Sequence, residues 1–238
     1  RQAAFPRGID DSLHLHPWRA AHDVCRRGWF GQSPGHRQHH PHEDLLRCIL
    51  GFHRPESGRI RLDGREISAE LPEHRRIGYV PQDYALFPHL DVEENLRFGL
   101  RPRRISAEQA DSLVERMCAV LNIASLRHRK VRHLSGGERQ KVAIGRALMM
   151  DPSVLLLDEP SAGLSPANQD LVFERVRGIA DSGVSIVMVE QNARRCLQIA
   201  DRAYVLDQGR NAHTGPGREL LHDPKVIDLY LGTLGKVE

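Results

Sequence analysis

The sequence predicts an α/β domain with a largely parallel β-sheet. Short apolar segments that suit buried strands alternate with longer segments that have helical apolar spacing. The clearest strand is Val-Leu-Leu-Leu at 154–157, because a continuous apolar run is typical of a strand buried on both faces of a parallel sheet. A length of 238 residues suits one large domain, or a core with a subdomain.

The elements follow in order from residue 45. Residues 45–52 should end a helix at Gly51, and residues 57–67 should form a hairpin around the turn dipeptide Asp63-Gly64. We expect residues 209–217 to be turn-rich and residues 218–231 to form a short helical tail. Further strands are expected at 77–80, 185–189 and 203–206, and further helices at 91–98, 107–121, 136–150, 166–180 and 192–200.

The composition excludes several classes of protein. With 40% hydrophobic and 27% charged residues, the chain resembles ordinary soluble domains. A net charge of +3 is too small to indicate nucleic-acid binding. The four cysteines have neither metal-ligand spacing nor a disulfide pattern, which fits a reducing compartment. We see no signal peptide and no apolar run of roughly 18 residues, so we expect any membrane role to be peripheral.

Residues 1–44 differ from the rest of the chain. They form an irregular segment that holds seven of the 14 histidines and both tryptophans, without helical or strand periodicity. Residues 45–238 are expected to form the folded domain, with a helical subdomain at 83–133 and a C-terminal strand and helical tail at 203–238. We find no internal repeat.

Two carboxylates follow the buried strand. Asp158 and Glu159 should lie at the carboxyl edge of a parallel sheet, where such folds bind ligands. One carboxylate can hold Mg²⁺, and the next can polarise a water for attack on a γ-phosphate. A solvated strand end that happens to carry two acids is the alternative.

A second candidate site lies at Ser135-Gly136-Gly137. Two glycines after a serine at the start of a helix expose backbone N–H groups and the positive end of the helix dipole, which together bind anions. A plain helix cap by Ser135 is the alternative. The pattern becomes specific because the full heptapeptide Leu134–Gln140 is followed by a helix and then by the Asp158-Glu159 strand.

This order and spacing resemble the nucleotide-binding subunits of ATP-binding-cassette (ABC) transporters, over residues 45 to about 232. The resemblance implies an α/β fold with a RecA-like P-loop NTPase core, a parallel sheet, antiparallel β-hairpins and a helical subdomain. It implies two subunits that sandwich ATP and Mg²⁺. Ser135, Gly136, Gly137 and Glu138 would belong to the signature segment that contacts the ATP held by the other subunit.

The resemblance also assigns roles to other residues. Asp158 is similar to the Walker B aspartate that holds Mg²⁺, and Glu159 to the catalytic base. Gln82 resembles the Q-loop glutamine, which senses Mg²⁺ and the attacking water, and residues 161–165 resemble the D-loop. Gln191 stands where most members carry a switch histidine. Glutamine can hydrogen-bond a γ-phosphate but cannot carry a positive charge.

The sequence Val-Glu-Gln-Asn-Ala at 189–193, with residues 200–206 and 219–232, resembles the subfamily that imports branched-chain and other hydrophobic amino acids. The implied function is an ATP-binding subunit that energises a membrane importer by ATP binding and hydrolysis. The implied partners are transmembrane permease subunits, a second ATP-binding subunit and, indirectly, a solute-binding protein, at the cytoplasmic face of the membrane. Nucleic acid is not an implied partner.

The phosphate-binding P-loop is missing as written. Family spacing places its lysine just before Leu45, where the sequence reads Pro41-His42-Glu43-Asp44, and the first lysine of the chain is Lys130. Three interpretations stay open: a metal site, a non-hydrolysing structural, regulatory or inactive cassette, and a frame-shifted translation after about Pro17. We favour the frame shift, because reading one base later from Trp18 permits a glycine-rich run. The metal site would use His36, His39, His40 and His42.

Overall fold

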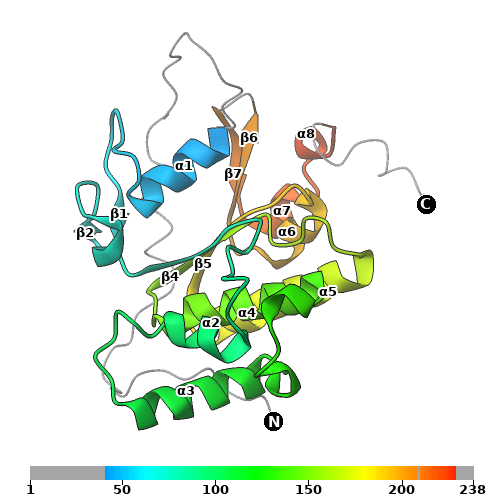
Figure 1. Cartoon of the computed structure of the whole chain (residues 1–238). Helices are drawn as coiled ribbons and strands as arrows, with labels where there is room; N and C mark the ends of the chain where they lie inside the picture. Colours follow the sequence, from blue (N-terminus) through cyan, green and yellow to red (C-terminus); the bar gives the residue numbers. More distant parts are fainter. Residues whose placement is uncertain (1–40, 208–209, 229–238) are drawn as a thin grey trace. The chain divides into compact units, whose positions relative to one another are not determined.

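The computed structural model describes residues 41–207 and 210–228 (Figure 1). The chain divides into two compact units, which are described separately. In the described part of the chain, the first unit is Arg76–Val189. Among the described residues, the second unit contains 41–75 and 190–228. No helix in the described ranges is long and apolar enough to cross a membrane.

The first unit is built on a three-stranded parallel sheet. Its strands are β3 (Ile77–Val80), β4 (Val154–Asp158) and β5 (Ser185–Val189), in the order β3-β4-β5. The central strand β4 is fully buried at Leu155, Leu156 and Leu157, which explains its continuous apolar sequence. The predicted parallel sheet is therefore confirmed, and its central strand ends at the two candidate acids.

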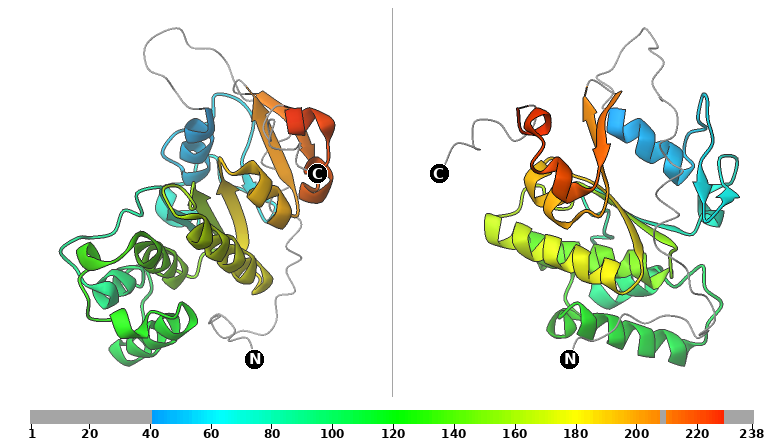
Figure 2. Two further views of the ribbon diagram at one scale, coloured as in Figure 1. Left: turned by 90° about the vertical axis from the view of Figure 1, so that its right-hand side faces the viewer. Right: turned by 180° about the vertical axis from the view of Figure 1, so that it is seen from behind.

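Four helices complete the first unit (Figure 2). Serine or aspartate side chains cap the first three, in capping boxes at Asp91, Ser106 and Ser135. These three helices contact one another around a common apolar core. The helices are α2 (Val92–Phe98), α3 (Ala107–Val120), α4 (Gly136–Met149) and α5 (Pro166–Asp181), with short 3₁₀ turns at Ala124–Leu126 and Val131–His133.

The contact between α2 and α4 is close enough to require glycine. A Cβ on Gly99, just after α2, would lie 2.2 Å from the carbonyl oxygen of Arg146 in α4. A Cβ on Gly145 would lie 2.7 Å from Cδ1 of Leu121. The second half of α4 is therefore packed closely against α2 and against the residue that ends α3.

The second unit begins with α1 (Pro41–Leu50), followed by the hairpin strands β1 (Arg61–Leu62) and β2 (Arg65–Glu66) and a 3₁₀ turn at Pro72–His74. The predicted hairpin is confirmed, and both of its turn residues have positive φ, 50° at Asp63 and 79° at Gly64.

The side chain of a buried arginine caps the carboxyl end of helix α1. Arg75 is only 1% exposed, and its Nη1 donates to the carbonyl oxygens of Cys48 at 2.7 Å and Ile49 at 2.8 Å. Its Nε donates to the carbonyl oxygen of Glu70 at 2.9 Å. The guanidinium thereby satisfies carbonyls that the end of a helix leaves without intrahelical donors.

The rest of the second unit forms a strand pair with short helices beside it (Figure 1). The prediction of a turn-rich segment at 209–217 was wrong, because Arg210–Gly215 is a strand that pairs antiparallel with Ala203–Asp207. Backbone pairing with a neighbour decides this strand, whose own sequence lacks strand alternation. The elements are α6 (Ala193–Ile199), β6 (Ala203–Asp207), β7 (Arg210–Gly215), α7 (Gly217–Leu220) and α8 (Pro224–Val226).

Candidate functional site

The carboxyl end of β4 carries both candidate acids. Asp158 is the last residue of the strand, and its Oδ2 accepts a hydrogen bond from the hydroxyl of Tyr79 on β3 at 3.1 Å. Tyr79 pairs with Leu156 in the parallel register, so its side chain can reach the strand end. The bond orients the Asp158 carboxylate at the edge of the sheet, where ligands bind in folds of this kind.

Glu159 is held in an unusual backbone conformation. Its φ is +45°, although non-glycine residues rarely adopt positive φ, and its side chain is 8% exposed. Its N–H donates to the carbonyl oxygen of Val189 at 2.9 Å. Its Oε2 accepts from Nε2 of Gln82 at 3.0 Å. The structure thus brings Gln82 and Glu159 together, and the left-handed backbone directs the carboxylate to that contact.

The chain after Gln82 is fixed to helix α4. Tyr84 and Ala85 have φ values of 67° and 43°, so two consecutive residues are left-handed. Arg146 of α4 donates to both of their carbonyl oxygens, at 3.1 Å to Tyr84 and 2.7 Å to Ala85. The guanidinium also lies over the Phe87 ring, 5.3 Å from its centre. These contacts hold the segment that places Gln82.

The signature segment begins helix α4. The Oγ of Ser135 accepts from the N–H of Glu138 at 3.3 Å, and Oε2 of Glu138 accepts from the N–H of Ser135 at 2.7 Å. The second bond lowers the pKa of the Glu138 carboxyl. The amides of Gly136 and Gly137 have no intrahelical acceptor in the first turn of a helix. They are therefore suited to an anion.

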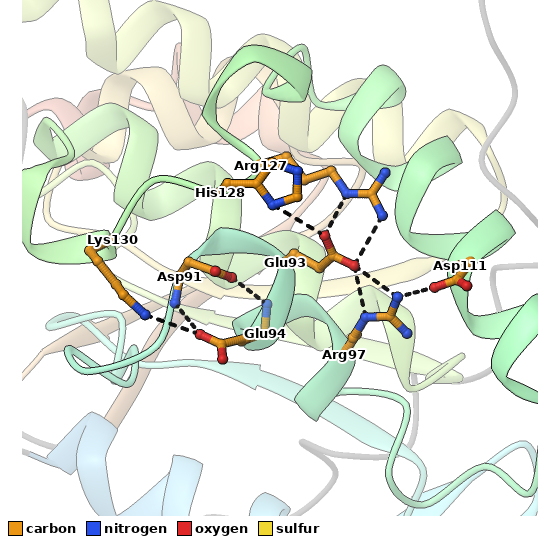
Figure 3. A network of polar contacts seen from close by, with 8 residues as sticks. All are labelled: Asp91, Glu93, Glu94, Arg97, Asp111, Arg127, His128 and Lys130. Carbon is orange, nitrogen blue, oxygen red and sulfur yellow. Dashed lines mark hydrogen bonds and ion pairs between the residues drawn. The ribbon is translucent and has the colours of Figure 1, made fainter.

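An ion-pair network holds the chain that leads to Ser135 (Figure 3). Arg127 donates from Nε to Oε2 of Glu93 at 2.6 Å, and Arg97 donates to Oε1 at 2.9 Å. Hydrogen bonds to the two arginines lower the pKa of Glu93 to about 2. The backbone also pairs there, because the N–H of Glu93 donates to the carbonyl oxygen of Arg127 at 2.9 Å. Residues 127–131 are thereby fixed just before the signature segment.

The predicted site residues fall into two groups in the structure. Gln82, Asp158 and Glu159 lie together at the ends of β3 and β4, and Ser135–Glu138 lie at the start of α4 in the same unit. Gln191 belongs to the second unit. The histidines proposed as metal ligands and the segment proposed to be frame-shifted lie outside the described residues, except for residues 41–44 at the start of α1.

Sequence reasoning gave no role to Tyr79 or Gln140. Tyr79 lies within the quoted segment that ends at Gln82, and the parallel pairing of its strand with β4 could have indicated its reach to Asp158. Gln140 closes the signature heptapeptide and is fully buried. The available signal was its position just before the apolar residues Val142, Ala143 and Ile144 of the same helix. A polar side chain buried with them needs a hydrogen-bond partner.

The oxygen atoms at the end of β4 suit Mg²⁺. The Asp158 carboxylate and the Gln82 carboxamide oxygen are hard donors of the kind that this ion takes in small number beside water and phosphate. In the described part of the chain, no cluster of three or more His, Cys, Asp or Glu side chains could hold a metal ion. Two oxygen donors fit an ion that keeps several waters among its ligands.

Known proteins match this chain in sequence over most of its length. The sequence model of the ABC transporter family matches residues 44–162. The chain is 40% identical over 181 residues to the molybdate/tungstate import ATP-binding protein WtpC of Pyrococcus abyssi, covering 76% of this chain and 53% of that protein. It is 40% identical to the high-affinity branched-chain amino acid transport ATP-binding protein BraG of Pseudomonas aeruginosa, covering 79% of this chain and 82% of that protein. The chain spans about half the length of several WtpC relatives.

Solved structures share the fold. A crystallised ATP-binding cassette of an ABC transporter aligns with a TM-score of 0.69 at 27% identity, covering 79% of this chain and 82% of that chain. The protein cbiO1 of Clostridium perfringens, part of the ABC transporter complex cbiONQ, aligns with a TM-score of 0.69 at 26% identity, covering 82% of this chain and 80% of that chain. The chain therefore belongs to the ABC transporter family, and its fold is that of the family's ATP-binding cassettes.

Proposed function

We propose that this chain is the ATP-binding subunit of a membrane importer. The hydrogen bond between Gln82 and Glu159 is the observation that carries the proposal, because it joins the end of β3 to a buried carboxylate at the end of β4. A base and a polar side chain in contact can orient a water for attack on a γ-phosphate. The amides in the first turn of α4 support the proposal further, because they can bind the anionic phosphates of a nucleotide.

In this proposal, each site residue has a defined role. Glu159 accepts a proton from the attacking water, and Gln82 holds its carboxylate in place. Asp158, oriented by Tyr79, and Gln82 hold Mg²⁺, which neutralises phosphate charge when it is bound. The backbone amides of Gly136 and Gly137, with Ser135 and Glu138, contact the nucleotide held by a second ATP-binding subunit. Gln191 donates a hydrogen bond to the γ-phosphate.

The proposed partners are transmembrane permease subunits, a second ATP-binding subunit and, indirectly, a solute-binding protein, at the cytoplasmic face of the membrane. The proposed solute is a branched-chain or other amino acid. Gln191 within Val-Glu-Gln-Asn-Ala and the similarity to BraG support an amino acid. The relatives named for molybdate and tungstate make an oxyanion the alternative solute. A version of this chain whose residues 18–44 are replaced by the matching segment of BraG should restore leucine uptake to Pseudomonas aeruginosa without BraG. If it fails there but restores molybdate uptake to Pyrococcus abyssi without WtpC, the oxyanion is favoured.

A second candidate function is a non-hydrolysing cassette that pairs with a competent subunit. It is favoured by the absence of any lysine before Lys130, because a P-loop lysine contacts the β- and γ-phosphates in working members. Asp44, in the α1 segment, would repel a triphosphate if it faced one.

One experiment separates the two functions. ATP hydrolysis is measured for the chain as given and for a repaired chain, in which residues 18–44 are replaced by the matching segment of BraG. Hydrolysis by the repaired chain alone supports the importer subunit and the frame-shift interpretation. Hydrolysis by both chains contradicts the frame shift, and hydrolysis by neither favours the non-hydrolysing subunit. Sequencing the codons from Pro17 to Leu45 tests the frame shift directly.

A further inference from the structure

The turn that follows Glu159 is under backbone constraint. Glu159 precedes Pro160, and a residue before proline normally takes extended backbone, yet Glu159 has a φ of +45°. Such a conformation persists only where the surroundings hold it. Pro160 has no N–H, so its carbonyl oxygen is its one backbone hydrogen-bonding group. Whatever bonds to that oxygen helps to set the peptide next to Glu159.

The Nε2 of Gln140 donates to the carbonyl oxygen of Pro160. Gln140 lies on α4 and is fully buried. The Oε1 of the same buried carboxamide has no hydrogen-bond partner among the described residues, so the bond from Nε2 is what holds this polar group in place. Two further bonds hold the same turn, from the N–H of Ala162 to the carbonyl oxygen of Glu159 at 3.0 Å and from Nε2 of Gln169 to the carbonyl oxygen of Ser161 at 3.3 Å.

The same face of α4 carries the start of the signature segment. Gly136 and Gln140 are four residues apart, so they lie one above the other on the helix. A Cβ on Gly136 would lie 3.2 Å from Cδ2 of Leu164, which belongs to the turn after Glu159. One face of α4 therefore contacts the turn twice, by packing at its first residue and by a hydrogen bond one helical turn later.

We propose that Gln140 is a positioning residue for Glu159, because it ties the turn after Glu159 to the helix that begins with the signature glycines. The inference rests on the proposed ATPase function and deepens it. In this arrangement, the helix that contacts one nucleotide also sets the orientation of the base that acts on another. Gln140 itself touches neither nucleotide.

The test uses Gln140→Met, which keeps the volume of the side chain and removes the donor. Hydrogen exchange of the full chain, followed by mass spectrometry, should show amides 159–164 exchanging at least about tenfold faster, with exchange in β3 unchanged. In whichever chain hydrolyses ATP, kcat should fall about tenfold or more, with KM for ATP changed less than about threefold. A structural cavity alone would not confine faster exchange to this turn.

Gln169→Met is the matched comparison. It removes the hydrogen bond between α5 and the same turn, and it leaves the bond from Gln140 of α4 in place. It should speed exchange in the turn but lower kcat less than Gln140→Met. If Gln140→Met does not fold, Gln140→Leu is a second apolar replacement of similar size that cannot donate a hydrogen bond. Unchanged exchange at 159–164 in a folded variant overturns the role of Gln140. If no parent chain hydrolyses ATP, the ATPase function is overturned instead. The exchange measurement does not need hydrolysis, so it still tests whether Gln140 holds the turn.

Discussion

Nε2 of Gln82 lies 3.0 Å from Oε2 of Glu159, although the two residues are 77 positions apart in the chain. The parallel pairing of β3 with β4 makes the contact possible, since it brings both strand ends to one edge of the sheet. The hydroxyl of Tyr79 reaches Asp158 from the same strand. Asp158 thus has a hydrogen-bond partner on β3, and Glu159 has one two residues beyond the end of that strand, so different side chains orient the two carboxylates.

Glu159→Gln should abolish most ATP hydrolysis and keep ATP binding. The carboxamide has nearly the same shape but cannot accept the proton of the attacking water, so kcat should fall at least about a hundredfold. Gln82→Met should lower kcat less, by about tenfold, because the base remains but loses its positioning bond. Hydrolysis and equilibrium ATP binding are measured on the same preparations, in the background of whichever chain hydrolyses ATP, with residues 18–44 as given or replaced. A Glu159→Gln variant with parental kcat would remove this residue from the mechanism.

Gly137→Ala should stabilise the protein and still impair hydrolysis. The nearest atom to an added Cβ, excluding chain neighbours, belongs to Asn168 at 3.9 Å, which is ordinary contact, and alanine favours helix by about 1 kcal/mol over glycine. The methyl group would occupy the place where a phosphate approaches the amides. Gly178→Ala in α5 is the control, because no atom lies within 4 Å of its added Cβ. Gly178→Ala should raise the stability of the protein by a similar amount and leave ATP hydrolysis unchanged. Thermal unfolding measures the stability of both variants, and ATPase assays measure their hydrolysis.

Glu93→Gln should destabilise the chain at neutral pH by about 1–3 kcal/mol, because Arg127 and Arg97 lose the charge that they share. The Glu93 pKa is lowered from 4.5 to about 2, so the ionised form stabilises the fold fully above pH 4.5. That contribution declines as the pH falls toward 2. Urea unfolding of parent and variant should therefore show a difference that narrows below pH 4.5.

Glu115→Gln, at an exposed position of α3, is the control for Glu93. Its stability should stay within about 0.5 kcal/mol of the parent across the same pH range. A constant difference between Glu93→Gln and the parent from pH 7 to pH 3 would contradict the assigned ionisation.

Arg75→Met should destabilise the second unit by about 3 kcal/mol or more, because several buried carbonyl oxygens lose a charged donor. Arg76→Met is the matched control, since its side chain is exposed and pairs with Asp151 at 3.8 Å at the surface. It should change stability by less than about 1 kcal/mol. Gly51→Ala should also destabilise, since its φ is +90° and an added Cβ would lie 2.7 Å from Nε of Arg75. Chemical unfolding of the three variants tests the set.

Local signals in the sequence were sufficient for most elements of the fold. Asp91, Ser106 and Ser135 mark the starts of three helices because a short polar side chain before a helix satisfies its first amides. The apolar run at 154–157 indicates a buried strand for a reason equally local, the exclusion of water from both faces. Strand β7 was missed because its residues have weak strand preference, and pairing with β6 decides it.

The sequence by itself determined the family, the two acids at the end of β4 and the signature start of α4, because each is a short pattern of adjacent residues whose chemistry depends on neighbours in the chain. Only the tertiary structure decided that Gln82 contacts Glu159, that Tyr79 contacts Asp158 and that Gln140 bonds to Pro160. These contacts join separate elements. They depend on strand register and helix packing, which are set by the core as a whole and by no single segment.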